Sequence, residues 1–259
     1  MKRSKRIVPD VFKKKRKVVV SAGLQSDWGC DQDSILSNLA LPNDTKVALD
    51  YVKSLLHVEV FEFRIPTIIF KHQIYSIVHN KTTVDRQLEE LKEKKVIKMF
   101  KLGIAVDEFC IVFTDDYKQH VKRQEPDNKT IDKFLDTVVD RCPDVSLTKS
   151  TMINEFCFTD EEITHLVSAG LLTVRDVGSW WLAIPGAGIF MKTFVKGRQS
   201  LLRTIRKCKY QEILQKNLEE KKLAAVKKLG MNFHILDIIG AELVKKIQTT
   251  SGCLLRLNE

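Results

Sequence analysis

The sequence predicts an α+β protein, mainly helical, with three tandem winged-helix domains behind a disordered basic N-terminal arm. A unit of one helix followed by a β-hairpin occurs twice, about eighty residues apart, and a less complete third copy follows after a similar interval. Further helical segments precede each copy, as in a winged helix. The hydrophobic fraction of 44% is ordinary for a chain that buries cores.

Residues 1–43 are expected to form the flexible arm. They combine a basic block with scattered Gly and Ser and show no sustained period. The block reads KKKRK, a pattern that nuclear import receptors or nucleic acid bind. It predicts nuclear localisation, with a solvated tail as the alternative. Its residues are Lys13, Lys14, Lys15, Arg16 and Lys17.

The first domain is predicted at 44–126. Two helical segments open it, and Thr82 and Thr83 are candidates to cap a third helix with apolar residues at helical spacing. Two strands then follow. The predicted elements are helices at 45–56, 65–78 and 84–94 and strands at 96–101 and 109–114, around a loop at 103–108.

The second domain is predicted at 127–190. Thr159 and Glu162 have the spacing of a capping box, and Gly170 is placed to end the helix that they begin. The predicted elements are helices at 130–142, 150–156 and 160–169 and strands at 171–175 and 180–184, joined by a turn at 176–179. Trp180 and Trp181 are adjacent in the second strand and therefore point to opposite faces. We expect one in the core and one partly covered, with a ring that stacks on a base or partner as the alternative.

The third domain is predicted at 191–259 and is the least regular. The predicted elements are helices at 190–209, 210–218, 235–239 and 241–247, a turn at 249–252 and a terminal strand at 253–257.

The segment 190–209 is the strongest functional signal. It reads FMKTFVKGRQSLLRTIRKCK, with seven Lys or Arg and no acid, in a chain of net charge +10. At about 100° per residue, five of its bases fall within an arc of roughly 100°, opposite the apolar residues. Solvated helix faces usually mix charges of both signs. A face of like charges therefore indicates a polyanionic partner.

Double-stranded DNA is the partner that we predict for this face. The helices at 84–94 and 160–169, which would enter the major groove in a DNA-reading winged helix, are too rich in Asp and Glu. The basic helix would instead contact phosphates, and five neutralised phosphates predict a slope of roughly −4 to −5 in log K against log salt. The predicted DNA-binding residues are Lys192, Lys196, Arg198, Arg203, Arg206, Lys207, Lys209, Lys221 and Lys222, with Lys227 and Lys228 nearby.

No catalytic or metal-binding pattern is present. The kinase glycine loop, catalytic loop and metal-binding Asp motif are missing, as are GxxxxGK[ST], GxSxG and HExxH. Six cysteines lie far apart, without zinc spacing, and are expected to be reduced. There is neither a signal-peptide pattern nor an apolar run near the ~18 residues of a membrane span. We predict no enzyme activity, no metal, no cofactor and no membrane contact.

The residues also carry a resemblance. TVDRQLEELKEKKVIKMFKLG, EITHLVSAGLLTVRDVGSWWLAIPGAG and TTSGCLLRL resemble the serine/threonine-protein kinase 19 family, whose members are also called winged helix repair proteins. The resemblance runs from about residue 55 to residue 257. It implies DNA contacts at Lys192, Arg206 and Lys221, the last standing where mammalian members carry Arg.

The resemblance further implies a role in transcription-coupled nucleotide excision repair on chromatin. The implied partners are stalled RNA polymerase II, the Cockayne-syndrome repair factors and transcription factor II H, whose helicase the protein would position on DNA. An atypical kinase, suggested by the family name alone, and a winged-helix module that binds only proteins remain as alternatives. We expect a monomer, and whether two copies pair on DNA stays open.

Overall fold

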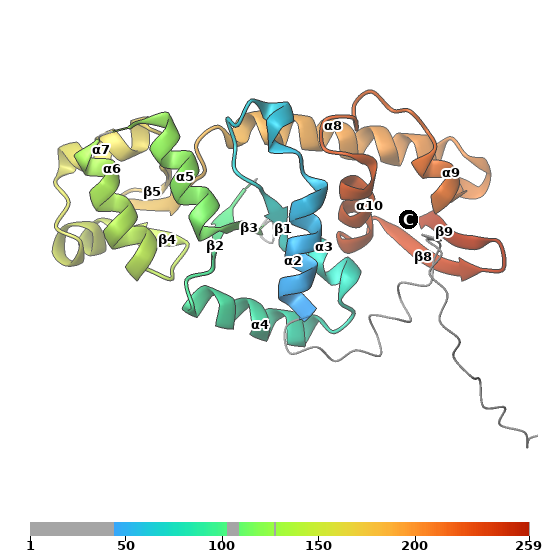
Figure 1. Ribbon diagram of the computed structural model, residues 1–259, viewed down its shortest axis with the longest axis horizontal. Coiled ribbons are helices and arrows are strands. Elements are labelled where there is room, and N and C mark those ends of the chain that lie inside the picture. Colours follow the sequence, from blue (N-terminus) through green and yellow to red (C-terminus); the bar gives the residue numbers. More distant parts are fainter. Residues whose placement is uncertain (1–43, 103–108, 127, 259) are drawn as a thin grey trace, which may run out of the picture.

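The structure, a computed structural model, describes residues 44–102, 109–126 and 128–258. Helices dominate, as predicted, and the described strands form three antiparallel sheets of three strands each (Figure 1). We call the parts built around them unit 1 (residues 44–124), unit 2 (residues 129–182) and unit 3 (residues 187–257). The predicted arm at 1–43, with its nuclear-localisation block, and the loop at 103–108 lie outside the described residues.

Unit 1 holds the first sheet, in the order β1-β3-β2. Two predictions here were wrong. The segment 65–78 is not one helix, because a short strand, β1, precedes helix α3. Thr82 and Thr83 do not cap the third helix, α4. Its cap is Asn80, whose Oδ1 accepts a hydrogen bond from the Thr83 amide at 3.1 Å. The elements are α2 (Asp44–Leu55), η1 (Val58–Phe61), β1 (Ile69–Phe70), α3 (Lys71–Ile77), α4 (Lys81–Glu93), β2 (Ile97–Lys101), β3 (Phe109–Phe113) and α5 (Thr114–Gln124).

Unit 2 holds the second sheet, in the order β4-β6-β5. The predicted capping box is confirmed, since the Thr159 hydroxyl accepts from the Glu162 amide and the Glu162 carboxylate accepts from the Thr159 amide. Gly170 follows α7 with φ +74°, as a helix-ending glycine should. The elements are α6 (Lys129–Phe134), the π-helical turn η2 (Leu135–Val139), β4 (Ser146–Thr148), η3 (Thr151–Glu155), α7 (Asp160–Ser168), β5 (Leu172–Asp176) and β6 (Ser179–Leu182).

Unit 3 holds the third sheet, in the order β7-β9-β8, and differs most from prediction. The helix predicted at 241–247 is wrong, because this segment mostly forms a strand in which Val244 lies opposite Leu257. The helix predicted at 210–218 is interrupted by strand β7 at Glu212–Leu214, and its last residues lie in α9. The elements are α8 (Ala187–Arg206), η4 (Lys209–Gln211), β7 (Glu212–Leu214), α9 (Gln215–Glu219), α10 (Met231–Gly240), β8 (Val244–Thr249) and β9 (Gly252–Leu257).

The three units share one order of elements. Each runs helix, strand, helix, helix and then a two-stranded hairpin, apart from the additional elements η1 and α5 in unit 1, η2 in unit 2 and η4 in unit 3. In each sheet the first strand pairs with the last, and the middle strand lies at the far edge. The third copy is therefore as complete as the other two, which the sequence pattern did not indicate.

The order of the units in space differs from their order in the chain. Unit 1 lies in the middle of the row, with unit 2 on one side and unit 3 on the other (Figure 1). Helix α10 of unit 3 packs on α3 of unit 1, and β6 of unit 2 lies near β2 of unit 1. Helix α8 runs along one edge of the row, past unit 1, and so carries the chain from unit 2 to unit 3.

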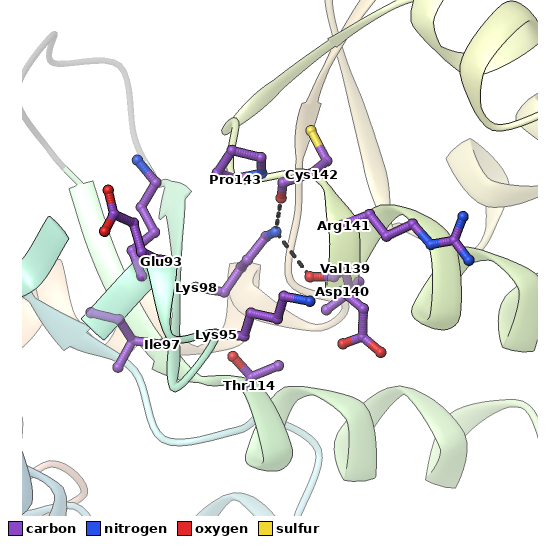
Figure 2. Close-up of a pocket in the computed structure, with 11 residues that line it drawn as sticks. Glu93, Lys95, Ile97, Lys98, Thr114, Val139, Asp140, Arg141, Cys142 and Pro143 are labelled. Carbon is purple, nitrogen blue, oxygen red and sulfur yellow. Dashed lines mark hydrogen bonds between the residues drawn. The ribbon is translucent and has the colours of Figure 1, made fainter. Parts of the chain in front are cut away.

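A buried lysine joins units 1 and 2. Lys98 of β2 is only 5% exposed, and its ammonium donates to the carbonyl oxygens of Val139 and Cys142 at the end of the first helical segment of unit 2 (Figure 2). Burial lowers the pKa of Lys98. The carbonyls at a helix C-terminus attract a cation, which compensates for part of this cost. A cavity of about 250 Å³ adjoins the contact, and Arg141 points away from Lys98.

The two tryptophans point to opposite faces, but neither is fully buried, so the expectation of one core ring is met only in part. Trp180 packs against the hydrophobic core of units 1 and 2. Trp181 is partly buried on the opposite face, where Lys101 Nζ lies 5.0 Å and Arg175 Cζ 4.5 Å from its ring centroid. The ring thus contacts cations of both units. Among the described residues, no helix is both long and apolar enough to cross a membrane.

Candidate nucleic-acid interface

Helix α8 buries the apolar side that its sequence predicts. Phe190, Phe194, Leu201 and Ile205 are completely buried. Phe190 and Phe194 join the core of units 1 and 2, where Phe194 stacks on Phe70 with ring centroids 4.4 Å apart. The other two join the separate core of unit 3. The helix is therefore fixed at both ends, and its outer face has a defined orientation.

The outer face of α8 and the residues just after it carry the predicted cations. We call this the α8 basic face: its bases are exposed, and none forms an ion pair with any residue in the described part of the chain. Bases on a solvated helix face usually pair with acidic side chains nearby. Among the described residues, the bases of this face are not paired in this way, and they are available to bind an external anion. Its members are Lys192, Lys196, Arg203, Arg206, Lys207 and Lys209.

The segment between α9 and α10 adds further bases beside this face. Val226 in this segment is buried in the same core as Leu201 and Ile205 of α8, which anchors the segment to the helix. In Figure 1 the segment arches past the C-terminal half of α8. Its four lysines are exposed and have no ion pair with a described residue: Lys221, Lys222, Lys227 and Lys228.

Arg198 departs from the predicted set. Its guanidinium points inward and binds the carboxylate of Asp237 through two hydrogen bonds, of 2.8 Å from Nε and 2.6 Å from Nη2. It also lies over the Phe194 ring, 4.5 Å from the centroid. The prediction of Arg198 as a DNA contact therefore finds no support in this geometry, and its role here is structural. Its position in the sequence could have indicated this inward orientation, because Arg198 lies about 120° from Lys192 around the helix and so outside the arc of the exposed bases.

Asp237 holds three elements together. Its carboxylate is completely buried in α10 and accepts from Arg198 of α8 and, at 2.7 Å, from His72 Nε2 of α3. Burial alone would raise the pKa of Asp237, but the hydrogen bonds from Arg198 and His72, together with the positive charge of Arg198, outweigh it and lower the pKa. The network links units 1 and 3 directly behind the α8 basic face.

Close backbone packing surrounds this network. Gly197 lets α8 approach the ring of His234, because a Cβ at position 197 would lie 2.2 Å from His234 Nε2. Gly240 lets α10 approach α3, where a Cβ would lie 1.9 Å from the His72 carbonyl oxygen. Burial lowers the pKa of His234 to about 4, so its ring is neutral at physiological pH.

The third helices of the units differ from α8 in charge or in exposure. Helix α4 exposes Glu89, Glu90 and Glu93, and α7 exposes Asp160 and Glu161. Helix α10 is unavailable for a different reason, since it packs against both α3 and α8. The basic surface of the described chain thus centres on α8.

The sequence interpretation missed the residues that orient α8. His72, Gly197, His234, Asp237 and Gly240 were not singled out. Asp237 had a readable signal, because a lone carboxylate within the apolar run FHILDIIG is rarely buried without a partner.

The chain is similar to several known proteins. Residues 47–257 match the family described as inactive serine-threonine protein kinase 19. Winged helix repair factor 1 of Homo sapiens is 45% identical over 221 residues, covering 84% of this chain and 87% of that protein. The protein of the same name from Xenopus laevis is 38% identical over 266 residues, covering 100% of both. That of Dictyostelium discoideum is 28% identical over 214 residues, covering 66% of this chain and 54% of its own length.

The names of these relatives connect them with a winged helix and with repair. The family description, by the word inactive, agrees with the lack of kinase motifs in this sequence. The match covers all three units, from α2 to β9. The chain therefore belongs to the inactive serine-threonine protein kinase 19 family.

Proposed function

We propose that this protein is a non-enzymatic adaptor that binds double-stranded DNA in a repair process. The observation that carries the proposal is the α8 basic face, with exposed bases that lack ion-pair partners among the described residues. We further propose that units 1, 2 and 3 are three tandem winged helices, which the recurring order of elements and the names of the relatives support.

In the proposed complex, α8 lies along the phosphate backbone. Lys and Arg side chains that contact phosphates fix the position of a protein on DNA without specifying a base sequence. The lysines of the α9–α10 segment would extend this contact, because the core of unit 3 anchors that segment beside α8. The binding should accordingly be strong at low salt, weak at high salt and little dependent on sequence.

The family resemblance supplies the finer proposal. We propose that the protein acts in transcription-coupled nucleotide excision repair in the nucleus and positions the helicase of transcription factor II H at stalled RNA polymerase II. The exposed acidic helices α4 and α7 suit contacts with protein partners such as the Cockayne-syndrome factors. This division would leave α8 for DNA and the acidic helices for proteins.

A charge-reversal pair with a matched control tests DNA binding. Arg206→Glu with Lys207→Glu reverses two exposed bases at the end of α8, and we expect duplex affinity to be abolished with little change in thermal unfolding. Lys94→Glu with Lys95→Glu is the control, because both lysines are exposed at the end of α4 and the charge change is identical. In Figure 1, α4 lies on the side of the row opposite α8.

Fluorescence anisotropy over a salt series gives the readout. Wild type and the α4 variant should both show a slope of roughly −4 to −5 in log K against log salt. Retained affinity in the α8 variant would contradict the proposal. If wild type fails to bind duplex DNA at low salt, the chain is better described as a winged-helix module for protein partners. We propose no kinase activity, since the motifs for phosphoryl transfer are absent from the sequence.

A further inference from the structure

The chain leaves α8 through a strained turn. Tyr210 has φ 58° and ψ 14°, and Gln211 has φ 55°, so two successive residues with a Cβ occupy the left-handed region. This conformation costs free energy for any residue but glycine. A hydrogen bond from the Gln211 amide to the Cys208 carbonyl, at 3.0 Å, and the start of β7 at Glu212 hold the turn in place.

The turn presents one aromatic ring to solvent. Tyr210 is 76% exposed, although an aromatic side chain gains free energy by leaving water. Lys209 Nζ lies 4.9 Å from the ring centroid, and Lys207 is exposed two residues before it. The ring therefore projects among cations that belong to the α8 basic face.

A similar turn with an aromatic residue occurs in unit 1. Glu62 and Phe63 also have successive positive φ values, of 55° and 56°. The Phe63 ring, however, packs under Arg123, with Cζ 5.5 Å from its centroid, and lines a cavity together with Ile65. Phe63 nevertheless stays 50% exposed, compared with 76% for Tyr210. The two rings therefore differ in degree: each has a cation above it, and Tyr210 is the more exposed.

We propose that Tyr210 is a stacking platform for an unpaired base, so that the α8 basic face recognises duplex DNA at the point where it opens into single strands. Aromatic rings beside cations are the usual means of binding single-stranded nucleic acid, because every base has a face on which a ring can stack. Within an intact duplex, neighbouring bases cover these faces. Only a base that has lost a neighbour offers one, while Lys207 and Lys209 can bind the adjoining phosphates.

This inference rests on the proposed DNA binding and specifies its substrate. The test compares an intact duplex with the same duplex extended by an unpaired fork, using the full chain and fluorescence anisotropy. Wild type should bind the fork more tightly. Tyr210→Ala should weaken fork binding by ~5- to ~100-fold, as for loss of one stacked base, and should change duplex affinity by less than about twofold.

Two further variants separate the ring from the backbone. Tyr210→Phe keeps the ring and should keep the preference for the fork. Tyr210→Gly removes the ring and also relieves the strain of the turn, and it should lose the preference as Tyr210→Ala does. If only one of Tyr210→Ala and Tyr210→Gly lost it, the turn conformation and not the ring would be responsible, which overturns the inference.

The outcomes distinguish this inference from the function on which it rests. Wild type that binds the intact duplex but shows no preference for the fork refutes the stacking role and leaves the proposed function standing. Equal loss on both DNAs in Tyr210→Ala has the same meaning. Wild type that binds neither DNA refutes the proposed function itself.

Discussion

Helices α8 and α10 pack against each other but use charge in opposite ways. The outer face of α8 displays exposed bases without ion-pair partners among the described residues. Helix α10 is largely apolar and buried, and its single carboxylate, Asp237, is completely enclosed and binds Arg198 and His72. The exposed bases of α8 are thus available to an external partner, whereas the carboxylate of α10 forms its hydrogen bonds within the fold.

The contrast shows that position decides what a charged residue contributes. An exposed base gains little from its surroundings, so its removal should hardly change stability. A buried carboxylate that binds Arg198 and the His72 ring is different, because removing it leaves both partners desolvated and unpaired. Arg198 is one of these partners and should therefore matter for stability, although it lies in the same helix as the exposed bases.

The largest expected effect comes from Asp237→Ala. Loss of the buried carboxylate leaves Arg198 and His72 without their partner, and we expect the free energy of unfolding to fall by about 3–5 kcal/mol. Chemical denaturation followed by circular dichroism measures the change. Lys192→Ala with Lys196→Ala, on the exposed side of α8, should leave it nearly unchanged. A similar decrease in the free energy of unfolding in both variants would contradict the distinction between buried and exposed charges.

The pH dependence of stability should show the next largest effect. The pKa of His234 is about 4 in the folded protein, below its ordinary value of 6.5. The unfolded chain therefore binds more protons in this window, and the free energy of unfolding should fall by up to about 3 kcal/mol as pH falls from 6.5 towards 4. His120, whose pKa burial also lowers, adds in the same direction.

His234→Gln isolates the contribution of that ring. Glutamine does not titrate, so its unfolding free energy should depend less steeply on pH between 6.5 and 4.5 than that of wild type. Denaturation curves at several pH values make the comparison. An unchanged slope would show that His234 takes up its proton as readily in the folded protein as in the unfolded chain.

The smallest of the three effects sharpens the contrast between the two sides of α8. Gly197→Ala places a methyl group 2.2 Å from the His234 ring, and we expect a loss of about 1–3 kcal/mol from overpacking. Gly188→Ala, in the same helix, meets nothing within 4 Å and should be neutral or stabilising by about 0.5–1 kcal/mol. Thermal unfolding of the two variants should thus shift in opposite directions, and equal shifts would place both glycines in similar surroundings.

Local signals in the sequence predicted much of units 1 and 2. The capping box at Thr159 and Glu162 and the hairpins at 96–114 and 171–184 need only neighbouring residues, and the structure contains them all. Unit 3 was predicted less well. Strand β7 depends on a distant partner, since Glu212 lies opposite Arg256 of β9. The strand at 244–249 pairs with the adjacent β9, so there the helical interpretation of a local pattern was itself wrong. Helix α10 was predicted too short, since a helix buried on two sides has no polar face to mark its period.

The sequence by itself determined that α8 is a helix with one apolar and one cationic side, because a period of 3.6 residues fixes which side chains share a face. It also determined the absence of any kinase motif. Only the tertiary structure decided that Arg198 turns inward, that α10 is enclosed and that unit 1 lies between units 2 and 3. These features rest on contacts such as His72 with Asp237, which are 165 residues apart in the chain and which no local pattern encodes.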